Sequence, residues 1–198
     1  MDKNFQETLQ PYLTIFRQEE GYFDDDEKRI SYFKNNPLNA EASEVLMKIS
    51  TMEHRQIDQL LPSRQIMADH IASLQIDEAL RQGAPEVVDA IAHLEVRDTP
   101  YFLYSFATRY CNWHNMDAYP IYDPTIHKLL TFYRQANGQD ALLTDELYHY
   151  PRFKELMVDF QQQLAMSDFN FKEIDKFVWI HGDKILRDLT DEIEPALA

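Results

Sequence analysis

Residues 99–136 read TPYFLYSFATRYCNWHNMDAYPIYDPTIHKLLTFYRQA, and this segment predicts two helices joined by a connection of about ten residues. Pro100 and Pro124 each suit the first turn of a helix, where no backbone N–H is needed. The first helix is expected to end near Trp113, and Asp123 is expected to cap the second. The segment therefore predicts a central helix-turn-helix.

The rest of the chain repeats this pattern of a polar cap followed by apolar residues at a spacing of three or four. The expected caps are Asn39, whose helix is predicted to continue to Leu61, Ser63 and Asn170. The four glycines, Gly21, Gly83, Gly138 and Gly182, fall where helices are expected to stop. Hairpin turns need residues with positive φ, so the shortage of glycine argues against strands. We predict an all-α fold of roughly eight to ten helices, with residues 1–198 forming a single compact domain.

The composition is that of an ordered and strongly acidic protein. The 198 residues include 19 Lys and Arg against 34 Asp and Glu, which gives a net charge of −15, and 44% of the residues are apolar. One cysteine excludes an internal disulfide framework and is typical of a reducing compartment. No stretch approaches the roughly 20 apolar residues of a membrane span, and the start MDKNFQETLQ has no apolar signal segment. We therefore expect a soluble, cytoplasmic protein without membrane contact.

The charge is unevenly distributed along the chain. Residues 1–97 hold 10 basic and 18 acidic side chains, and residues 139–198 hold 6 and 13, whereas residues 98–138 hold three of each. Acidic flanks repel nucleic acid, so nucleic-acid contact is expected only through the neutral segment and its neighbours. Arg97, Arg109 and Lys128 are the candidate contacts there. The acidic flanks are interpreted either as solvated helix faces or as a surface for a basic partner.

Aromatic and polar side chains gather around the predicted connection. The candidate ligand-binding residues are Tyr110, Trp113, His114, Asn115, Tyr119, Tyr122 and His127. Such a set suits a cleft in which a planar ligand stacks on aromatic rings. The alternative is that these aromatic side chains form the core between helices.

The same segment also contains residue types that can bind a metal. Cys111 and His114 are three residues apart, and Asp123 and His127 are four apart. Zinc accepts all three residue types, but no second close pair of Cys or His completes a zinc signature. We therefore expect no metal and no cofactor, with Cys111 a small buried apolar group.

Two stretches, TPYFLYSFATRYCNW at residues 99–113 and AYPIYDPTIHKLLTFY at residues 118–133, resemble the centre of the helix-hairpin-helix base-excision DNA glycosylases. The resemblance covers about residues 94–133 and implies that Asp123 is the catalytic carboxylate. The chain departs from that family in two respects. Leu103, Tyr104 and Ser105 stand where bifunctional members carry a lysine, and the glycine-rich hairpin that binds DNA phosphate is missing.

The sequence leaves two hypotheses about function and does not decide whether the chain is an enzyme. The first is a non-catalytic binding module for a protein partner or for a small ligand in an aromatic cleft. The second is a degenerate glycosylase-like DNA-binding or DNA-repair protein that uses Asp123. The chain also resembles uncharacterised bacterial proteins in ATRYCNWHN and KEIDKFVWIHGDK.

Overall fold

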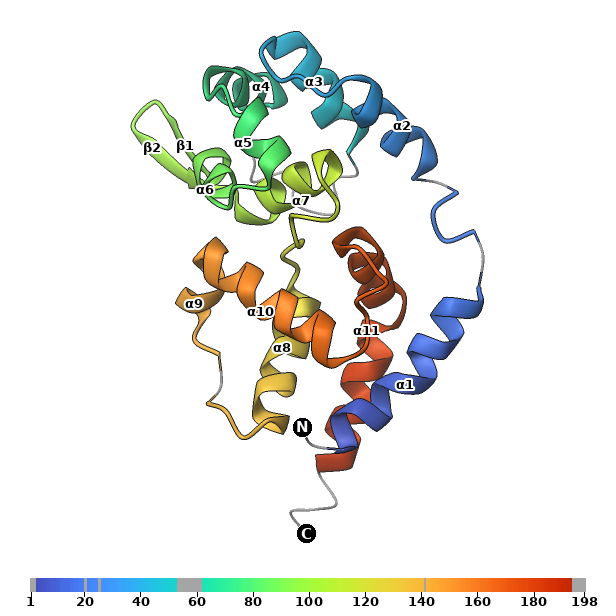
Figure 1. The fold of residues 1–198 in the computed structure, drawn as a ribbon. Coiled ribbons are helices and arrows are strands. Elements are labelled where there is room, and N and C mark those ends of the chain that lie inside the picture. Colours follow the sequence, from blue (N-terminus) through green and yellow to red (C-terminus); the bar gives the residue numbers. More distant parts are fainter. Residues whose placement is uncertain (1–2, 20, 25, 53–61, 141, 194–198) are drawn as a thin grey trace. The chain divides into compact units, whose positions relative to one another are not determined.

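The chain folds into helices and one small sheet in the computed structural model (Figure 1), which describes residues 3–19, 21–24, 26–52, 62–140 and 142–193. Eleven helices and a two-stranded sheet lie within those residues, so the predicted all-α fold class is confirmed. Contacts divide the chain into two compact units. Unit 1 comprises residues 1–22 and 122–198, and unit 2 comprises residues 23–121. The single domain stays a prediction.

Unit 2 is a group of short helices that carries a β-hairpin. Its elements are α2 (Glu27–Asn35), α3 (Ala42–Thr51), α4 (Arg64–Ser73), α5 (Asp77–Gln82), α6 (Glu86–Ala92), β1 (His93–Val96), β2 (Thr99–Phe102) and α7 (Tyr104–His114). Helix α3 packs against α4, and α6 packs against α7, so each amphipathic helix buries its apolar face against a neighbour. The helix predicted to run to Leu61 ends at Thr51 in the structure, and residues 53–61 lie outside the described residues.

The hairpin contradicts the prediction that the chain has no strand. It also contradicts the prediction that a helix begins at Pro100, because Pro100 lies in β2 and α7 begins at Tyr104. Strands β1 and β2 pair antiparallel, with Val96 opposite Thr99, and Figure 1 shows them extending from α6. Arg97 and Asp98 form the two-residue turn, with φ of 50° and 62°. A tight hairpin turn requires this left-handed conformation, which glycine usually supplies. The prediction failed because two residues with side chains take the conformation expected of glycine.

Unit 1 is built around the long helix α11. Its elements are α1 (Lys3–Gln18), α8 (Pro124–Ala136), α9 (Thr144–Tyr148), α10 (Tyr150–Gln163) and α11 (Phe171–Ile193). Helix α11 packs against both α1 and α8 (Figure 1). The Phe16 ring meets the edge of Phe177 at a centroid distance of 5.6 Å, and the Tyr12 hydroxyl donates to Asp188 Oδ2 over 2.6 Å. The two ends of the chain's described part are thus joined through paired helices.

Gly182 was predicted to end a helix, and the structure shows it inside α11 instead. A Cβ atom at Gly182 would lie 2.6 Å from Thr125 Cγ2 of α8, so glycine allows the two helices to approach closely. The other three predicted helix stops fit better, because Gly21, Gly83 and Gly138 all have positive φ. Packing between helices decides the role of glycine at position 182.

Three of the four predicted helix caps are confirmed. Ser63 Oγ accepts the Ile66 N–H, Asp123 Oδ1 accepts the Thr125 N–H, and Asn170 Oδ1 accepts the Glu173 N–H, over 3.3, 2.7 and 2.9 Å. Asn39 was predicted as the fourth cap, and this prediction is wrong. Glu41 occupies the cap position of α3, and the Asn39 side chain is buried against other helices.

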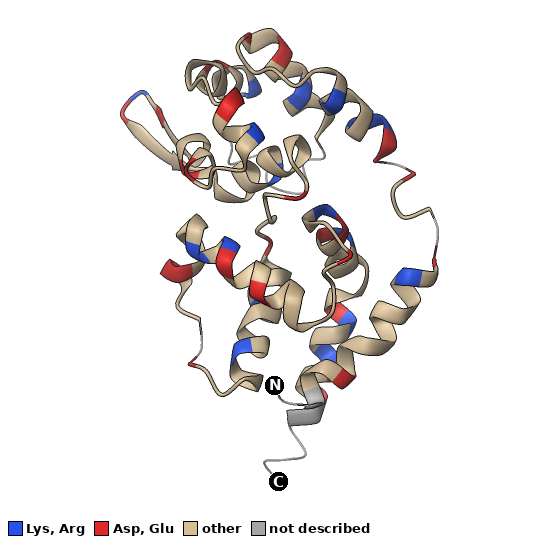
Figure 2. Ribbon diagram, in the orientation of Figure 1, with Lys and Arg blue, Asp and Glu red and all other residues tan. Residues whose placement is uncertain are grey.

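Charged side chains of both signs are distributed over the helices of both units (Figure 2). Because the described helices carry charged side chains or are short, none of them is long and apolar enough to cross a membrane.

Candidate functional site

The candidate residues of the central segment are divided between the two units. Tyr110, Trp113, His114, Asn115 and Tyr119 belong to unit 2, whereas Tyr122, Asp123, His127 and Lys128 belong to unit 1. The boundary falls between Ile121 and Tyr122, inside the predicted connection. Each group is therefore built by its own unit, and a cleft shared by all of these side chains stays a prediction.

The aromatic residues in unit 2 take core positions. Tyr110 and Tyr119 are completely buried, and the Trp113 ring stacks on Phe33 at a centroid distance of 5.8 Å. The Tyr119 hydroxyl donates to the Ala84 carbonyl over 3.0 Å. Burial raises the pKa of the Tyr119 phenol, so this group stays neutral. These contacts fit the alternative in which the aromatic side chains form a core.

A buried polar cluster surrounds Tyr110, and sequence reasoning missed most of its members. Asn39 Oδ1 accepts hydrogen bonds from the Tyr110 hydroxyl over 2.6 Å and from Lys48 Nζ over 2.8 Å. The side-chain Nδ2 of Asn39 donates to Asp77 Oδ1 over 2.8 Å, and the backbone N–H of Asn39 donates to the same oxygen over 2.9 Å. Lys48 Nζ also donates to the Leu38 carbonyl. The sequence signal for this cluster was Lys48, a charged residue on the helix face that also carries the apolar Val45 and Ile49.

Burial also changes the protonation of this cluster. It lowers the pKa of the Lys48 ammonium from 10.5 to about 8, and it lowers the pKa of His114 from 6.5 to about 3. The positive charge of Lys48 lowers the pKa of His114 further. Lys48 is fully buried, and His114 Nε2 is a buried atom for which the described part of the chain offers no hydrogen-bond partner. The cluster ties the 36–41 connection to α3, α5 and α7 through buried and partly buried hydrogen bonds, which is the arrangement of a structural network.

In unit 1, Asp123 and its neighbours support the start of α8. Asp123 caps the helix, and the Tyr122 hydroxyl lies 3.2 Å from His127 Nδ1. The Tyr122 ring is buried against Tyr148 and Phe153, at centroid distances of 5.4 and 5.7 Å. Burial lowers the pKa of His127. Tyr122 thus packs against the helices on both sides of the junction of α9 and α10.

An open groove with a volume of about 460 Å³ lies at that junction. Its lining residues are Asp145, Glu146, His149, Pro151, Arg152 and Glu155. His149 has an extended backbone between the two helices, and Pro151 stands in the first turn of α10. The chain therefore changes direction here, and the bend produces the concave surface. We name this site the α9–α10 groove.

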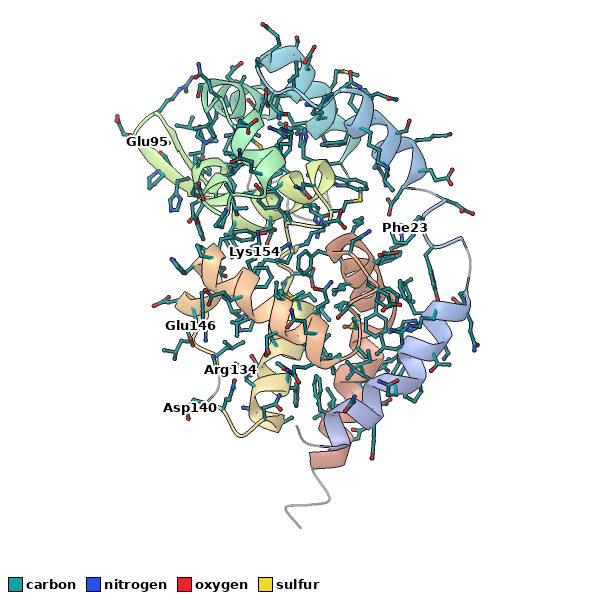
Figure 3. All side chains as sticks on the ribbon, viewed as in Figure 1. Phe23, Glu95, Arg134, Asp140, Glu146 and Lys154 are labelled. Atoms are coloured by element: carbon teal, nitrogen blue, oxygen red, sulfur yellow. The ribbon has the colours of Figure 1, made fainter. Side chains whose placement is uncertain are left out.

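Two arginines and two glutamates form a charge network in and beside the groove. Glu146 Oε1 lies 3.5 Å from Arg134 Nη1 and 3.8 Å from Arg152 Nε. Glu155 Oε2 accepts a hydrogen bond from Arg152 Nη1 over 3.1 Å. Figure 3 shows Arg134 and Glu146 close together, and Figure 2 shows the acidic residues of α9 and the mixed charges of α10. Asp145 is the third carboxylate of the groove, and no ion pair between it and a described residue is seen.

Arg134 and the start of α9 hold the network in place, and two exposed apolar side chains lie near its residues in sequence. Arg134 is only 13% exposed in its side chain, and its buried Nε and Nη1 atoms have no hydrogen-bond partner among the described residues. Glu146 Oε2 accepts the Leu143 N–H over 3.2 Å, which fixes this carboxylate at the start of α9. Leu143 is 68% exposed and Tyr148 is 39% exposed. Glu146 is therefore a fixed carboxylate of the groove, and accessible apolar side chains occur in the same segment of the chain.

The other predicted contacts are dispersed. Arg97 lies in the hairpin turn and Arg109 on α7, both in unit 2, whereas Lys128 lies on α8 in unit 1. A basic face shared by the three stays a prediction. Among the described residues, no group of three or more His, Cys, Asp and Glu side chains is placed to hold a metal ion. Cys111 is buried, and burial raises the pKa of its thiol well above the usual value.

The chain was compared with known families, proteins and structures. A family model described as HI_0787_N, N-terminal domain, matches residues 8–118. A Haemophilus influenzae protein described as uncharacterized is 33% identical over 120 residues, which cover 60% of this chain and 57% of that protein. The chain thus spans somewhat more than half of this relative's length. No solved structure matches. The predicted likeness to uncharacterised bacterial proteins is confirmed, whereas the matches do not show a likeness to base-excision glycosylases.

Proposed function

The chain belongs to the HI_0787_N family through residues 8–118, and we propose that it is a non-catalytic module that binds a basic segment of a partner protein in the α9–α10 groove. The groove lies beyond the residues that match the family model. Its support therefore comes from the geometry of unit 1.

The observation that carries the proposal is the lining of the groove. Asp145, Glu146 and Glu155 contribute three carboxylates to one concave surface, and Arg152 is the arginine that faces them. The side chain of Glu155 is 68% exposed, so a cation from solvent can reach it. Carboxylates at a partly enclosed surface favour ammonium and guanidinium groups by charge-assisted hydrogen bonds.

Exposed apolar side chains beside the groove favour a peptide segment over a small cation. Leu143 and Tyr148 flank the lining residues in sequence, and both are exposed. Protein interfaces combine apolar contacts with charged contacts, and aromatic side chains such as tyrosine are enriched in them. A segment that alternates basic and apolar residues would satisfy both features.

The net charge of −15 supports the same class of partner, because a strongly acidic protein attracts basic molecules and repels nucleic acid. The glycosylase alternative lacks comparable support. Asp123, its carried-over carboxylate, is engaged with the Thr125 N–H as a helix cap. The groups with the largest downward pKa shifts, Lys48 and His114, lie in the closed cluster of unit 2. We therefore place function in the groove.

The experiment is a fluorescence anisotropy titration with a labelled peptide, SRLSRLSRL, and its acidic counterpart, SELSELSEL. The arginine peptide should bind and the acidic peptide should not. Asp145→Asn with Glu155→Gln should weaken binding about tenfold, or about 1.4 kcal/mol. The matched control is Glu44→Gln with Glu95→Gln, which removes two exposed carboxylates of unit 2. Equal losses in both double variants would show nonspecific attraction and overturn the proposal.

A further inference from the structure

We propose that Arg152 occupies, in the free protein, the position that an arginine of the partner takes in the complex. This inference rests on the proposed function. It deepens that function by naming the partner's side chain and by assigning Arg152 as an internal competitor that the partner displaces.

The geometry around Arg152 is that of a guanidinium between two carboxylates. Its Nη1 atom donates to Glu155 Oε2 over 3.1 Å, and its Nε atom lies 3.8 Å from Glu146 Oε1. Only the first contact is a hydrogen bond, because 3.8 Å is beyond hydrogen-bond range. A guanidinium has five N–H donors. At 3.8 Å, however, the Nε–H group of Arg152 does not form a hydrogen bond with Glu146 Oε1. The two carboxylates can therefore accept a better-placed guanidinium.

The two carboxylates differ in how firmly they are held. Glu146 is fixed by the Leu143 N–H at one oxygen and by Arg134 at the other. Glu155 is 68% exposed and is bound by Arg152, so its carboxylate can reorient once that hydrogen bond breaks. A fixed acceptor and an adjustable acceptor suit the planar fork of arginine, which binds carboxylates with directional bonds. The compact ammonium of lysine gains less from this arrangement.

Displacement of Arg152 is inexpensive in free energy. Its side chain is 41% exposed, and its hydrogen bond to Glu155 joins residues three apart on one helix. Exposed pairs at this spacing change a helix equilibrium by only about a factor of two. Arg152 can therefore turn toward solvent when a partner arginine enters, and its departure removes a like charge from the site.

An anion site is the opposite interpretation of the same residues. Arg134 has buried Nε and Nη1 atoms that no described residue engages in a hydrogen bond, and both Arg134 and Arg152 lie within 4 Å of Glu146. An acidic ligand would then need Arg152, whereas an arginine ligand must compete with it. The two interpretations predict opposite effects of removing Arg152.

The test compares Arg152→Ala and Arg152→Gln with Arg187→Ala in titrations with SRLSRLSRL and with its lysine counterpart, SKLSKLSKL. Arg187 is exposed on α11 and donates from Nε to the Asp183 carbonyl, so its removal changes the net charge equally. We expect both Arg152 variants to bind the arginine peptide about two- to fivefold more tightly, and the Arg187 variant to gain less than either of them. The gain should be smaller for the lysine peptide. Circular dichroism of each variant checks the fold.

The outcomes separate the inference from the proposed function. If the wild-type protein binds the arginine peptide and the Arg152 variants bind it no more tightly than Arg187→Ala, the inference is overturned and the proposed function stands. Weaker binding after loss of Arg152, or binding of the acidic peptide, supports an anion site and also overturns the inference. Absence of binding to the wild type and to both Arg152 variants contradicts both proposals.

Discussion

Thr125 and Gly182 meet where α8 and α11 pack together, and no space remains for a side chain at position 182. A Cβ atom there would lie 2.6 Å from Thr125 Cγ2 and 3.1 Å from Val178 Cγ1. This contact joins the start of α8, which Asp123 caps, to the middle of the longest helix of unit 1. It therefore fixes part of the scaffold on which the groove is built.

Gly182→Ala should destabilise the protein although alanine favours helices. The gain in helix propensity is about 1 kcal/mol, whereas overpacking typically costs about 1–3 kcal/mol. Urea denaturation should show a net loss of stability. Thr125→Ser removes the obstructing Cγ2 atom, so the double variant should recover most of the loss. A double variant as unstable as Gly182→Ala would show that Thr125 is not the obstacle.

His114 should make the protein sensitive to acid. Its pKa is about 3 in the folded state and about 6.5 when unfolded, so the unfolded state binds more protons between these values. The stabilising contribution is complete above about pH 6.5 and is lost progressively as the pH falls toward 3. At pH 5 the wild type should have lost about 2 kcal/mol relative to pH 7.5 from this group.

The measurement is urea denaturation of wild type and His114→Phe at pH 7.5 and pH 5. His114→Phe should lose less stability on acidification, because phenylalanine does not titrate and fits the aromatic contacts with Phe33 and Tyr110. His93→Gln, at an exposed hairpin position, is the control and should behave as the wild type. Parallel losses in wild type and His114→Phe would contradict the assignment.

Asn39→Ala should be among the more destabilising single changes in unit 2. It removes the acceptor of Tyr110 and Lys48 and leaves a buried ammonium short of a partner, at a cost of about 3 kcal/mol. Lys48→Met should reduce that cost, because the charge is then absent. Thermal and urea unfolding of the two single variants and the double variant measure the coupling. Asn36→Ala, which removes a bond to the Tyr32 carbonyl, should cost much less. Additive effects at Asn39 and Lys48 would count against a connected network.

The hairpin turn should be improved by the residues that its backbone conformation favours. Arg97→Asn with Asp98→Gly places asparagine and glycine at the two positions with positive φ. We expect a gain of about 1 kcal/mol in the free energy of unfolding, since both residues adopt this conformation at little cost. Exchanging the order, to glycine then asparagine, provides the comparison. A loss of stability with asparagine–glycine would contradict the turn geometry.

Much of the helical fold was predictable because its signals are local. Ser63, Asp123 and Asn170 bond to backbone amides two or three residues away, and such caps are visible in any short window of sequence. The fold class follows from these caps and from apolar periodicity. Helix boundaries were less accurate where the decisive contact comes from elsewhere in the chain, as at Asn39 and Gly182.

The groove could not be predicted from local patterns. Helix α9 has only five residues and ends at an extended His149, so it is too short to show a clear helical periodicity in the sequence. The charge network also joins residues from α8, α9 and α10, and no spacing rule links Arg134 to Glu146. Position in the sequence drew attention to the aromatic residues near Trp113, whereas tertiary packing buried them.

The most direct test of the groove is a map of peptide-induced shifts in the backbone amide spectrum of the isotope-labelled protein. Titration with SRLSRLSRL should move the amides of residues 143–155, with the largest changes around Asp145 and Glu155, and should move the side-chain Nε–H signal of Arg152. The acidic peptide should leave these signals in place. Shifts confined to other surfaces, or an unchanged spectrum at millimolar peptide, would contradict the assignment of the α9–α10 groove as the binding site.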